Sequence, residues 1–77
     1  MFLEIITPEK KLYSGEVTMV HVPGTSGQFE VLNNHAPLIS TLLKGAVKII
    51  TSEGEKTFEV NGGVIEVLKN KVVLLAE

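Results

Sequence analysis

Turn-forming residues interrupt this chain at intervals of a few residues to about a dozen, which leaves only short segments between them. These segments are rich in β-branched side chains, since ten Val, six Ile and six Thr make 22 of the 77 residues. Short β-branched runs between regularly spaced turns are typical of all-β sandwiches and barrels. The turn signals lie at residues 7–9, 23–27, 33–37, 52–54, 61–63 and 69–70.

No apolar repeat of helical period persists for ten residues, so we expect no helix. Strands are predicted over residues 2–6, 11–22 (broken around Ser14 and Gly15), 28–32, 38–43, 45–51, 56–60, 64–68 and 71–75. Gly45 is expected to mark a reversal, and Gly62 and Gly63 a second, tight one, because glycine tolerates positive φ. The whole chain, residues 1–77, is predicted to form one small domain.

The last hairpin predicts which side chains form the core. If Lys69 and Asn70 make a two-residue turn, strand alternation assigns each flanking residue to one of two faces. The expected core face consists of Ile65, Val67, Val72 and Leu74. The other face holds Glu66, Leu68, Lys71, Val73 and Leu75, more apolar than a solvated sheet face usually is. It is either covered in a larger assembly or an ordinary surface with scattered leucines.

Composition argues against several classes of function. The chain has no cysteine, which excludes disulfides, thiolate catalysis and cysteine-ligated zinc. It has no arginine, four aromatic residues and a net charge of −2, so nucleic-acid binding is not expected. No segment approaches the roughly 18 apolar residues of a spanning helix, and the start lacks a signal-peptide pattern. We therefore expect no direct insertion into a membrane.

Residues that carry chemistry are few. His21 and His35 are the only imidazoles, and their spacing fits no metal-binding motif, so neither a metal nor another cofactor is expected. His21 is expected on a strand, on the same side as Val17 and Met19, in a structural or surface role. Residues 24–28 depart from the nucleophile elbow of hydrolases because no glycine stands at Gln28 and no helix follows. The sequence predicts a protein without an active site.

Two motifs, found in order along the chain, resemble a known family. The first is GQFEVLNNHAPLISTL over residues 27–42, and the second is GGVIEV over 62–67 followed by NKVVLLAE over 70–77. The opening segment also fits, with TPE at 7–9 and YSG at 13–15. Over nearly all 77 residues, the chain resembles the epsilon subunit of ATP synthase.

The resemblance implies the amino-terminal domain of that subunit, a ten-stranded β-sandwich of two five-stranded, mostly antiparallel sheets. It implies a non-catalytic central-stalk subunit, part of the rotor, that links the gamma subunit to the c-ring of a bacterial proton-translocating ATP synthase. Such a subunit lies peripherally at the cytoplasmic face of the plasma (inner) membrane. Because the sequence stops at Glu77, the C-terminal two-helix domain of the family, with its inhibitory arm and its ATP binding, is expected to be absent.

The same resemblance implies which residues bind partners, at the end of the domain that faces the ring and gamma. They are Ser26, Gly27, Gln28, Phe29, Asn33, Asn34, His35, Ala36, Pro37 and Ser40. Phe29 is either a small interface anchor or a core aromatic. His35 is expected to hold its turn by hydrogen bonding to the backbone while one edge faces a partner. Family members often carry an acidic residue at the position of Gln28, so the resemblance does not extend to a charge-paired contact with the ring at this position.

A different class of function fits one feature. Biotinyl and lipoyl carrier domains display a lysine at a hairpin tip, and Lys69 would occupy such a tip. The flanking methionine or aspartate of those modules is absent. An unmodified intact mass after expression in a host competent for biotin and lipoate attachment would exclude a carrier.

Overall fold

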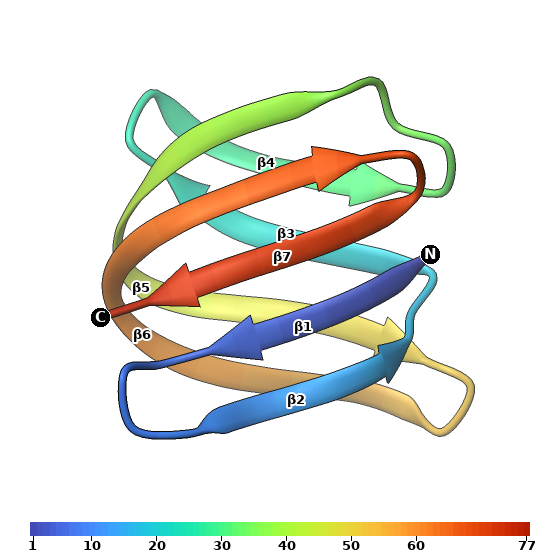
Figure 1. Cartoon of the computed structure of the whole chain (residues 1–77), viewed down its shortest axis with the longest axis horizontal. Coiled ribbons are helices and arrows are strands. Elements are labelled where there is room, and N and C mark those ends of the chain that lie inside the picture. The colour runs from blue at the N-terminus through green and yellow to red at the C-terminus, as the bar shows by residue number, and fades with distance from the viewer.

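The computed structural model describes residues 1–77 as an all-β chain of seven strands (Figure 1). They form one hydrogen-bonded sheet in the order β2-β1-β7-β6-β5-β3-β4, antiparallel throughout except for the β1/β7 pair. The strands are β1 (Phe2–Ile6), β2 (Lys11–Glu16), β3 (Met19–Gly24), β4 (Gly27–Leu32), β5 (Leu38–Thr51), β6 (Gly54–Leu68) and β7 (Lys71–Ala76). The predicted all-β class is confirmed, but the structure has seven strands in a single sheet, not ten in two five-stranded sheets.

The strand number differs because β5 and β6 are long and curved. They pair with each other from Leu38 and Val67 to Thr51 and Gly54 in one register, and the ladder skips only the step at Leu43. Figure 1 shows both strands bending around one side of the molecule, so that each contributes to two facing layers. The single sheet thus folds over on itself and encloses a core, as a sandwich does.

The two reversals expected within these strands do not exist. Gly45 lies inside β5 opposite Val60, so the predicted strands 38–43 and 45–51 are one. Gly62 and Gly63 lie inside β6, so 56–60 and 64–68 are also one strand. Both glycines do have positive φ, at 120° and 148°. Here that conformation bends a continuous strand instead of reversing the chain.

Gly63 pairs with Ala76 at the end of β7. A Cβ at Gly63 would overlap the carbonyl oxygen of Leu75. The absent side chain therefore permits both the bend and the close approach of two strands.

The break expected around Ser14 and Gly15 falls later, at Val17 and Thr18. The N–H of Val17 donates to the carbonyl of Met1 (2.9 Å), beside β1, whereas the N–H of Thr18 donates to the carbonyl of Ile50 (2.8 Å), in β5. The chain passes at this point from one layer to the other, so each residue pairs with a different layer.

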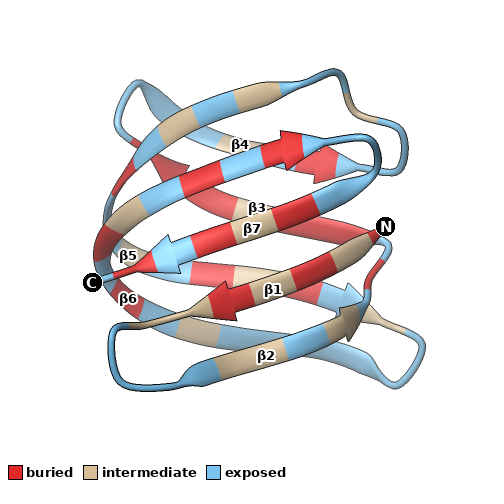
Figure 2. Ribbon diagram, in the orientation of Figure 1, coloured by how far each residue is buried: buried red, intermediate tan, exposed pale blue.

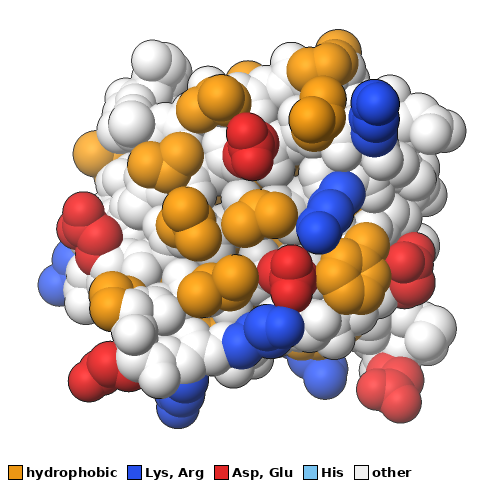
Figure 3. Space-filling view, viewed as in Figure 1, with side chains coloured by type: hydrophobic (Ala, Val, Ile, Leu, Met, Phe, Trp, Pro, Cys, Tyr) orange, Lys and Arg blue, Asp and Glu red, His pale blue; other side chains and the backbone are white.

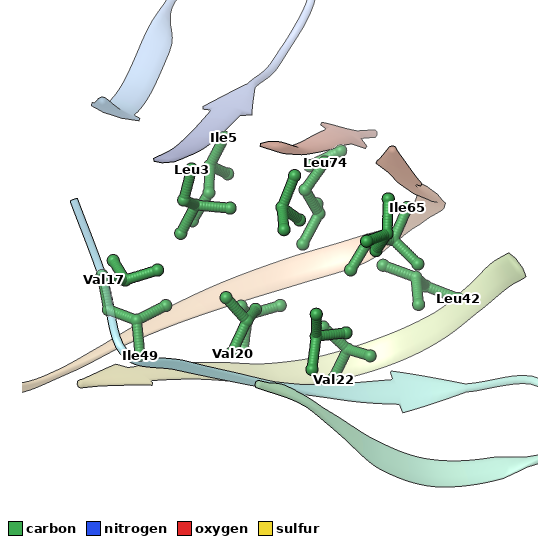
Figure 4. Close-up of a cluster of buried hydrophobic side chains, with 14 of the residues drawn as sticks. Leu3, Ile5, Val17, Val20, Val22, Leu42, Ile49, Ile65 and Leu74 are labelled. Carbon is green, nitrogen blue, oxygen red and sulfur yellow. The ribbon is translucent and has the colours of Figure 1, made fainter. Parts of the chain in front are cut away.

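One hydrophobic cluster fills the space between the layers (Figures 2 and 4). Figure 4 shows Leu3, Ile5 and Leu74 pointing from one layer toward Val20 and Val22 of the other. The predicted register of the last hairpin is confirmed, because Leu68 pairs with Lys71. Its predicted core face is confirmed too, with exposures of 0% or 2% for Ile65, Val67, Val72 and Leu74.

The structure has no helix that could span a membrane.

Candidate functional site

The two predicted partner-binding segments lie at opposite ends of β4. Residues 25–26 form the turn that joins β3 to β4, and residues 33–37 form the loop that joins β4 to β5. In Figure 1 they are the teal turn and the green loop on opposite sides of the view. A six-residue strand separates its ends by roughly 20 Å. The structure therefore places the predicted partner-binding segments at two separate places, not together at the single end expected from the sequence.

The β3–β4 turn is held against β5. The N–H of Thr25 donates to the carbonyl of Thr41 (3.0 Å), and the two hydroxyls are hydrogen-bonded at 2.7 Å. Ser40 lies beside this contact and donates its hydroxyl to the carbonyl of Thr41 (3.1 Å). Ser26 and Gly27 are exposed at the tip. The turn is thus a small polar projection on a fixed support, with the predicted residues Ser26 and Gly27 at its tip and Ser40 beside it in β5.

Phe29 belongs to the core side of this hairpin. It is partly buried and packs against the hydrophobic cluster. Its ring lies against Gly24, where a Cβ would stand 2.7 Å from a ring carbon. This packing favours the core interpretation of Phe29 over the interface anchor. Gln28, the next residue toward the tip, is exposed on the other side of β4.

The loop over residues 33–37 is fixed by its own histidine. The backbone N–H of His35 donates to the carbonyl of Leu32 (3.2 Å). The ring Nδ1 lies 2.7 Å from the carbonyl oxygen of Ala36. Because a carbonyl only accepts, Nδ1 carries the proton, and Nε2 is the ring edge that a partner would meet. The expected backbone-holding role of His35 is confirmed.

Two asparagines tie this loop to distant parts of the chain. Oδ1 of Asn33 accepts a hydrogen bond from the amino group of Met1 (2.7 Å). Asn34 has a φ of 64°, and its N–H donates to Oδ1 of Asn70 in the β6–β7 turn (2.8 Å). Ala36 and Pro37 are exposed at the loop's outer edge. The loop, the N-terminus and the last turn therefore form one end of the molecule.

An apolar surface, which we call the outer apolar face, extends over four neighbouring strands on the side turned away from the core. Figure 3 shows hydrophobic side chains gathered there over β1, β7 and β6, with a few charged groups between them. Ile39 is 70% exposed, Leu75 53% and Leu68 50%. Alternation and register place on this face Phe2, Ile6, Ile39, Val64, Leu68, Val73 and Leu75.

The outer apolar face reaches the loop through a shallow groove. The groove is lined by Pro37, Leu38 and Ile39 on one side and by Glu66, Val67 and Leu68 on the other. The last hairpin alone predicts part of this surface. The contributions of β1 and β5 were not predicted, because they depend on the long-range pairing of β1 with β7 and of β5 with β6.

Glu4 is the charged centre of the β1 part of this face. Its carboxylate lies 2.9 Å from Nζ of Lys11 and 3.8 Å from Nζ of Lys71. The hydrogen bond from Lys11 lowers the pKa of Glu4, and the charges of both lysines act in the same direction. The carboxylate therefore stays ionised, with its charge balanced inside the chain.

The structure also shows where the residues considered for a metal site and for a carrier lysine lie. The structure contains no group of three or more His, Asp or Glu side chains arranged to hold a metal ion. His21 is half-buried in β3, paired with Glu30 of β4 and Lys48 of β5. Lys69 stands at the tip of the β6–β7 turn, with a φ of 51°, as the predicted two-residue turn requires.

The whole chain, residues 1–77, matches the family described as ATP synthase, Delta/Epsilon chain, beta-sandwich domain. An ATP synthase epsilon chain of Chlorobium limicola is 43% identical over 76 residues, which cover 97% of this chain and 86% of the relative. One of Caulobacter vibrioides is 40% identical over 77 residues, which cover 100% of this chain and 90% of the relative. One of Pelotomaculum thermopropionicum is 50% identical, but the match spans only 55% of that longer relative.

Two solved structures have the same fold. A chain in the cryo-EM structure of the central stalk and c-ring of Tetrahymena thermophila mitochondrial ATP synthase matches with a TM-score of 0.83 and 18% identity. A chain in the Euglena gracilis mitochondrial ATP synthase structure matches with a TM-score of 0.89 and 18% identity. The matches cover 99% and 96% of this chain, and 62% and 48% of those chains. On its full-length family match and its close relatives, this chain belongs to the delta/epsilon chain family of ATP synthase, as the β-sandwich domain.

Proposed function

We propose that this chain works as the epsilon subunit of a bacterial F-type ATP synthase. In that role it is a central-stalk subunit without an active site, which binds the gamma subunit, contacts the c-ring and turns with both during proton-driven ATP synthesis. It would lie peripherally at the cytoplasmic face of the plasma membrane. Membership of the family and relatives named ATP synthase epsilon chain support this proposal.

The outer apolar face is the observation that carries the proposal. Soluble monomers rarely expose a contiguous apolar surface over several strands, and such a surface usually marks a protein interface. Its charges are few, and Glu4 is already neutralised by Lys11 and Lys71. An interface core is depleted in charge and surrounded by a polar rim, which matches this arrangement. We assign the face to gamma, the partner expected to hold the subunit firmly.

The loop over residues 33–37 extends the proposed gamma contact. It borders the outer apolar face across the groove at Pro37 and Ile39. Its backbone is fixed by His35 and by the Asn34–Asn70 hydrogen bond, so little ordering would be required on binding. The exposed edge of His35 and the residues Ala36 and Pro37 would form part of the rim.

The β3–β4 turn suits a different contact. Ser26, Gly27 and Gln28 are small or polar and exposed, which fits a hydrated contact with the polar loops of the c-ring. Since this turn lies at the other end of β4 from the loop, one rigid domain can touch both partners at once. With glutamine at position 28, the ring contact would depend on hydrogen bonds and not on a salt bridge.

Complex formation with gamma tests the proposal. Mixed with the gamma subunit at micromolar concentration, the chain should co-elute in size-exclusion chromatography. Added to an enzyme depleted of its epsilon subunit, it should restore coupling between proton flow and ATP synthesis. Failure to form a gamma-dependent complex, with both proteins folded, would contradict the proposal. A mass increase that matches a biotinyl or lipoyl group would instead favour the carrier function at Lys69.

A further inference from the structure

A polar hollow lies on the layer opposite the outer apolar face. Four strands contribute to it, β3, β4, β5 and β6, and no carboxylate is among its lining residues. Its polar side chains are His21, Gln28, Lys44, Lys48 and Thr57. Neither lysine takes part in an ion pair, since the three ion pairs of the molecule involve Met1, Lys11 and Lys71. In a chain with a net charge of −2, this hollow concentrates positive charge.

The hollow exists because the β3/β5 ladder is interrupted. His21 pairs with Lys48, but the next bridged pair is Gly24 with Leu42. Two residues of β3 thus span the same gap as five residues of β5, so β5 bulges away from its neighbour. Pro23 lies in this gap and has no N–H to donate to the ladder.

Small residues form the floor of the hollow, so no side chain fills it. Gly45 and Ala46 lie in the bulged part of β5 and line the hollow. The ring of Pro23 packs over Gly45, 3.4 Å from the position of a Cβ. The longer side chains of Lys44 and Lys48 flank this floor on the same strand. They belong to residues four apart, so alternation directs both to the same side of the sheet.

The arrangement is suited to an anion. Lys44 and Lys48 project from the same side of β5, and like charges held on one side of a strand repel unless a counter-charge lies between them. His21, the cross-strand neighbour of Lys48, adds an imidazole to the hollow. The hydroxyl of Thr57 and the amide of Gln28 add neutral hydrogen-bond donors. Glu30 faces His21 from the β4 side, and Glu59 pairs with Ala46 from the β6 side, so a carboxylate limits the positive region at each of these two edges.

We propose that this hollow binds a phosphate-type oxyanion, either free phosphate or the phosphate of a lipid headgroup. The Lys44 and Lys48 ammonium groups would donate charge-assisted hydrogen bonds to the oxygens, and Gln28 and Thr57 would complete the shell. The site is separate from the proposed gamma contact because the two surfaces lie on opposite layers. Gln28 also belongs to the proposed c-ring contact, so the hollow borders that contact while it is separate from the gamma contact.

An NMR titration at pH 7 and constant ionic strength tests the site. Inorganic phosphate added to the 15N-labelled 77-residue chain should shift the backbone amides of residues 21, 28, 44–48 and 57 along a saturating curve. The Lys44→Gln/Lys48→Gln variant should bind about tenfold more weakly or not at all, since two charge-assisted hydrogen bonds are lost. The control variant Lys10→Gln/Lys69→Gln, which has the same net charge as Lys44→Gln/Lys48→Gln, should bind phosphate as tightly as the unmodified chain does.

Gln28→Glu supplies an independent variant. The substitution is nearly isosteric and exposed, so the fold should survive, while the new carboxylate would pair with the lysines and displace phosphate.

A second experiment distinguishes a lipid headgroup from free phosphate, with vesicles of phosphatidylcholine with or without phosphatidic acid. Sedimentation with phosphatidic acid that depends on Lys44 and Lys48 would identify a lipid headgroup, and saturation by phosphate alone would identify the free ion. Non-saturating shifts, or equal effects in the Lys10/Lys69 variant, would overturn the proposal.

Discussion

The N–H of Asn34 donates to the side-chain oxygen of Asn70 at 2.8 Å, although 36 residues separate them in sequence. The same turn residue accepts the N–H of Phe2 on its backbone carbonyl (3.1 Å). Asn70 thereby connects the β6–β7 turn, the start of β1 and the loop over residues 33–37. The loop that borders the proposed gamma contact is positioned by a side chain of the last hairpin.

Replacing Asn70 should separate its two roles. Asn70 has a φ of 61°, which glycine adopts without strain, so Asn70→Gly removes only the side-chain hydrogen bond. We expect a loss of about 0.5–1.5 kcal/mol in the free energy of unfolding. Asn70→Ala should cost about 1 kcal/mol more, because alanine is strained at positive φ. Urea unfolding measures both, and amide exchange at Asn34 should accelerate in each variant; unchanged exchange would contradict the role of the hydrogen bond.

Leu75 should be required for partner binding but not for folding. It is 53% exposed on the outer apolar face, and Leu32, also 53% exposed, lies on β4 in the other layer. Leu75→Ser should weaken gamma binding by about 1–2 kcal/mol, whereas Leu32→Ser should not change it. Both should change unfolding stability by no more than about 0.5 kcal/mol. Titration calorimetry with gamma gives the comparison, and equal effects of the two substitutions would argue against the outer apolar face as the interface.

Gly63 should be the least replaceable glycine. Alanine at this position is strained at a φ of 148° and also collides with the backbone of Leu75. We expect Gly63→Ala to lower the free energy of unfolding by at least about 3 kcal/mol. Gly54, the first residue of β6 after the β5–β6 turn, has a φ of 116° but open space around it, so Gly54→Ala should cost only about 1 kcal/mol. Urea midpoints measure the difference, and similar losses would show that β7 does not restrict the bend.

Glu4 should make stability depend on acidity. Its pKa is lowered in the folded chain, chiefly by the hydrogen bond from Lys11, so folding favours the ionised carboxylate. This contribution is complete above the ordinary glutamate pKa of about 4.3. It is lost as the pH falls from there through the lower pKa of the folded state.

Glu4→Gln removes that dependence. Urea unfolding measured from neutral to acidic pH should show a smaller decline for Glu4→Gln than for the unmodified chain, with the difference confined to the acidic range. Glu53→Gln serves as the control, because Glu53 is exposed in the β5–β6 turn and makes no ion pair. Parallel curves for Glu4→Gln and the unmodified chain would exclude a contribution from Glu4.

The local sequence pattern was sufficient to predict much of this protein's structure. Strict alternation around a two-residue turn predicted the register and core face of the last hairpin, because both depend on neighbours within a dozen residues. The ordered motifs predicted the family. Strand 2–6 was predicted with its observed bounds, since it is a short apolar run that ends at a clear turn.

The path of the chain at its glycines could not be predicted from the sequence and was determined only by the folded structure. At Gly45, Gly62 and Gly63 the sequence permits either a reversal or a bend, because positive φ and a missing side chain serve both. Pairing of β5 with β6 in one register selects the bend, and the close passage of β7 completes it. The outer apolar face and the hollow at Lys48 have the same origin: residues distant in sequence become neighbours only when strands pair. Composition and alternation determined that the chain forms strands and which sides face inward, and long-range pairing determined which strands meet and what surfaces they make.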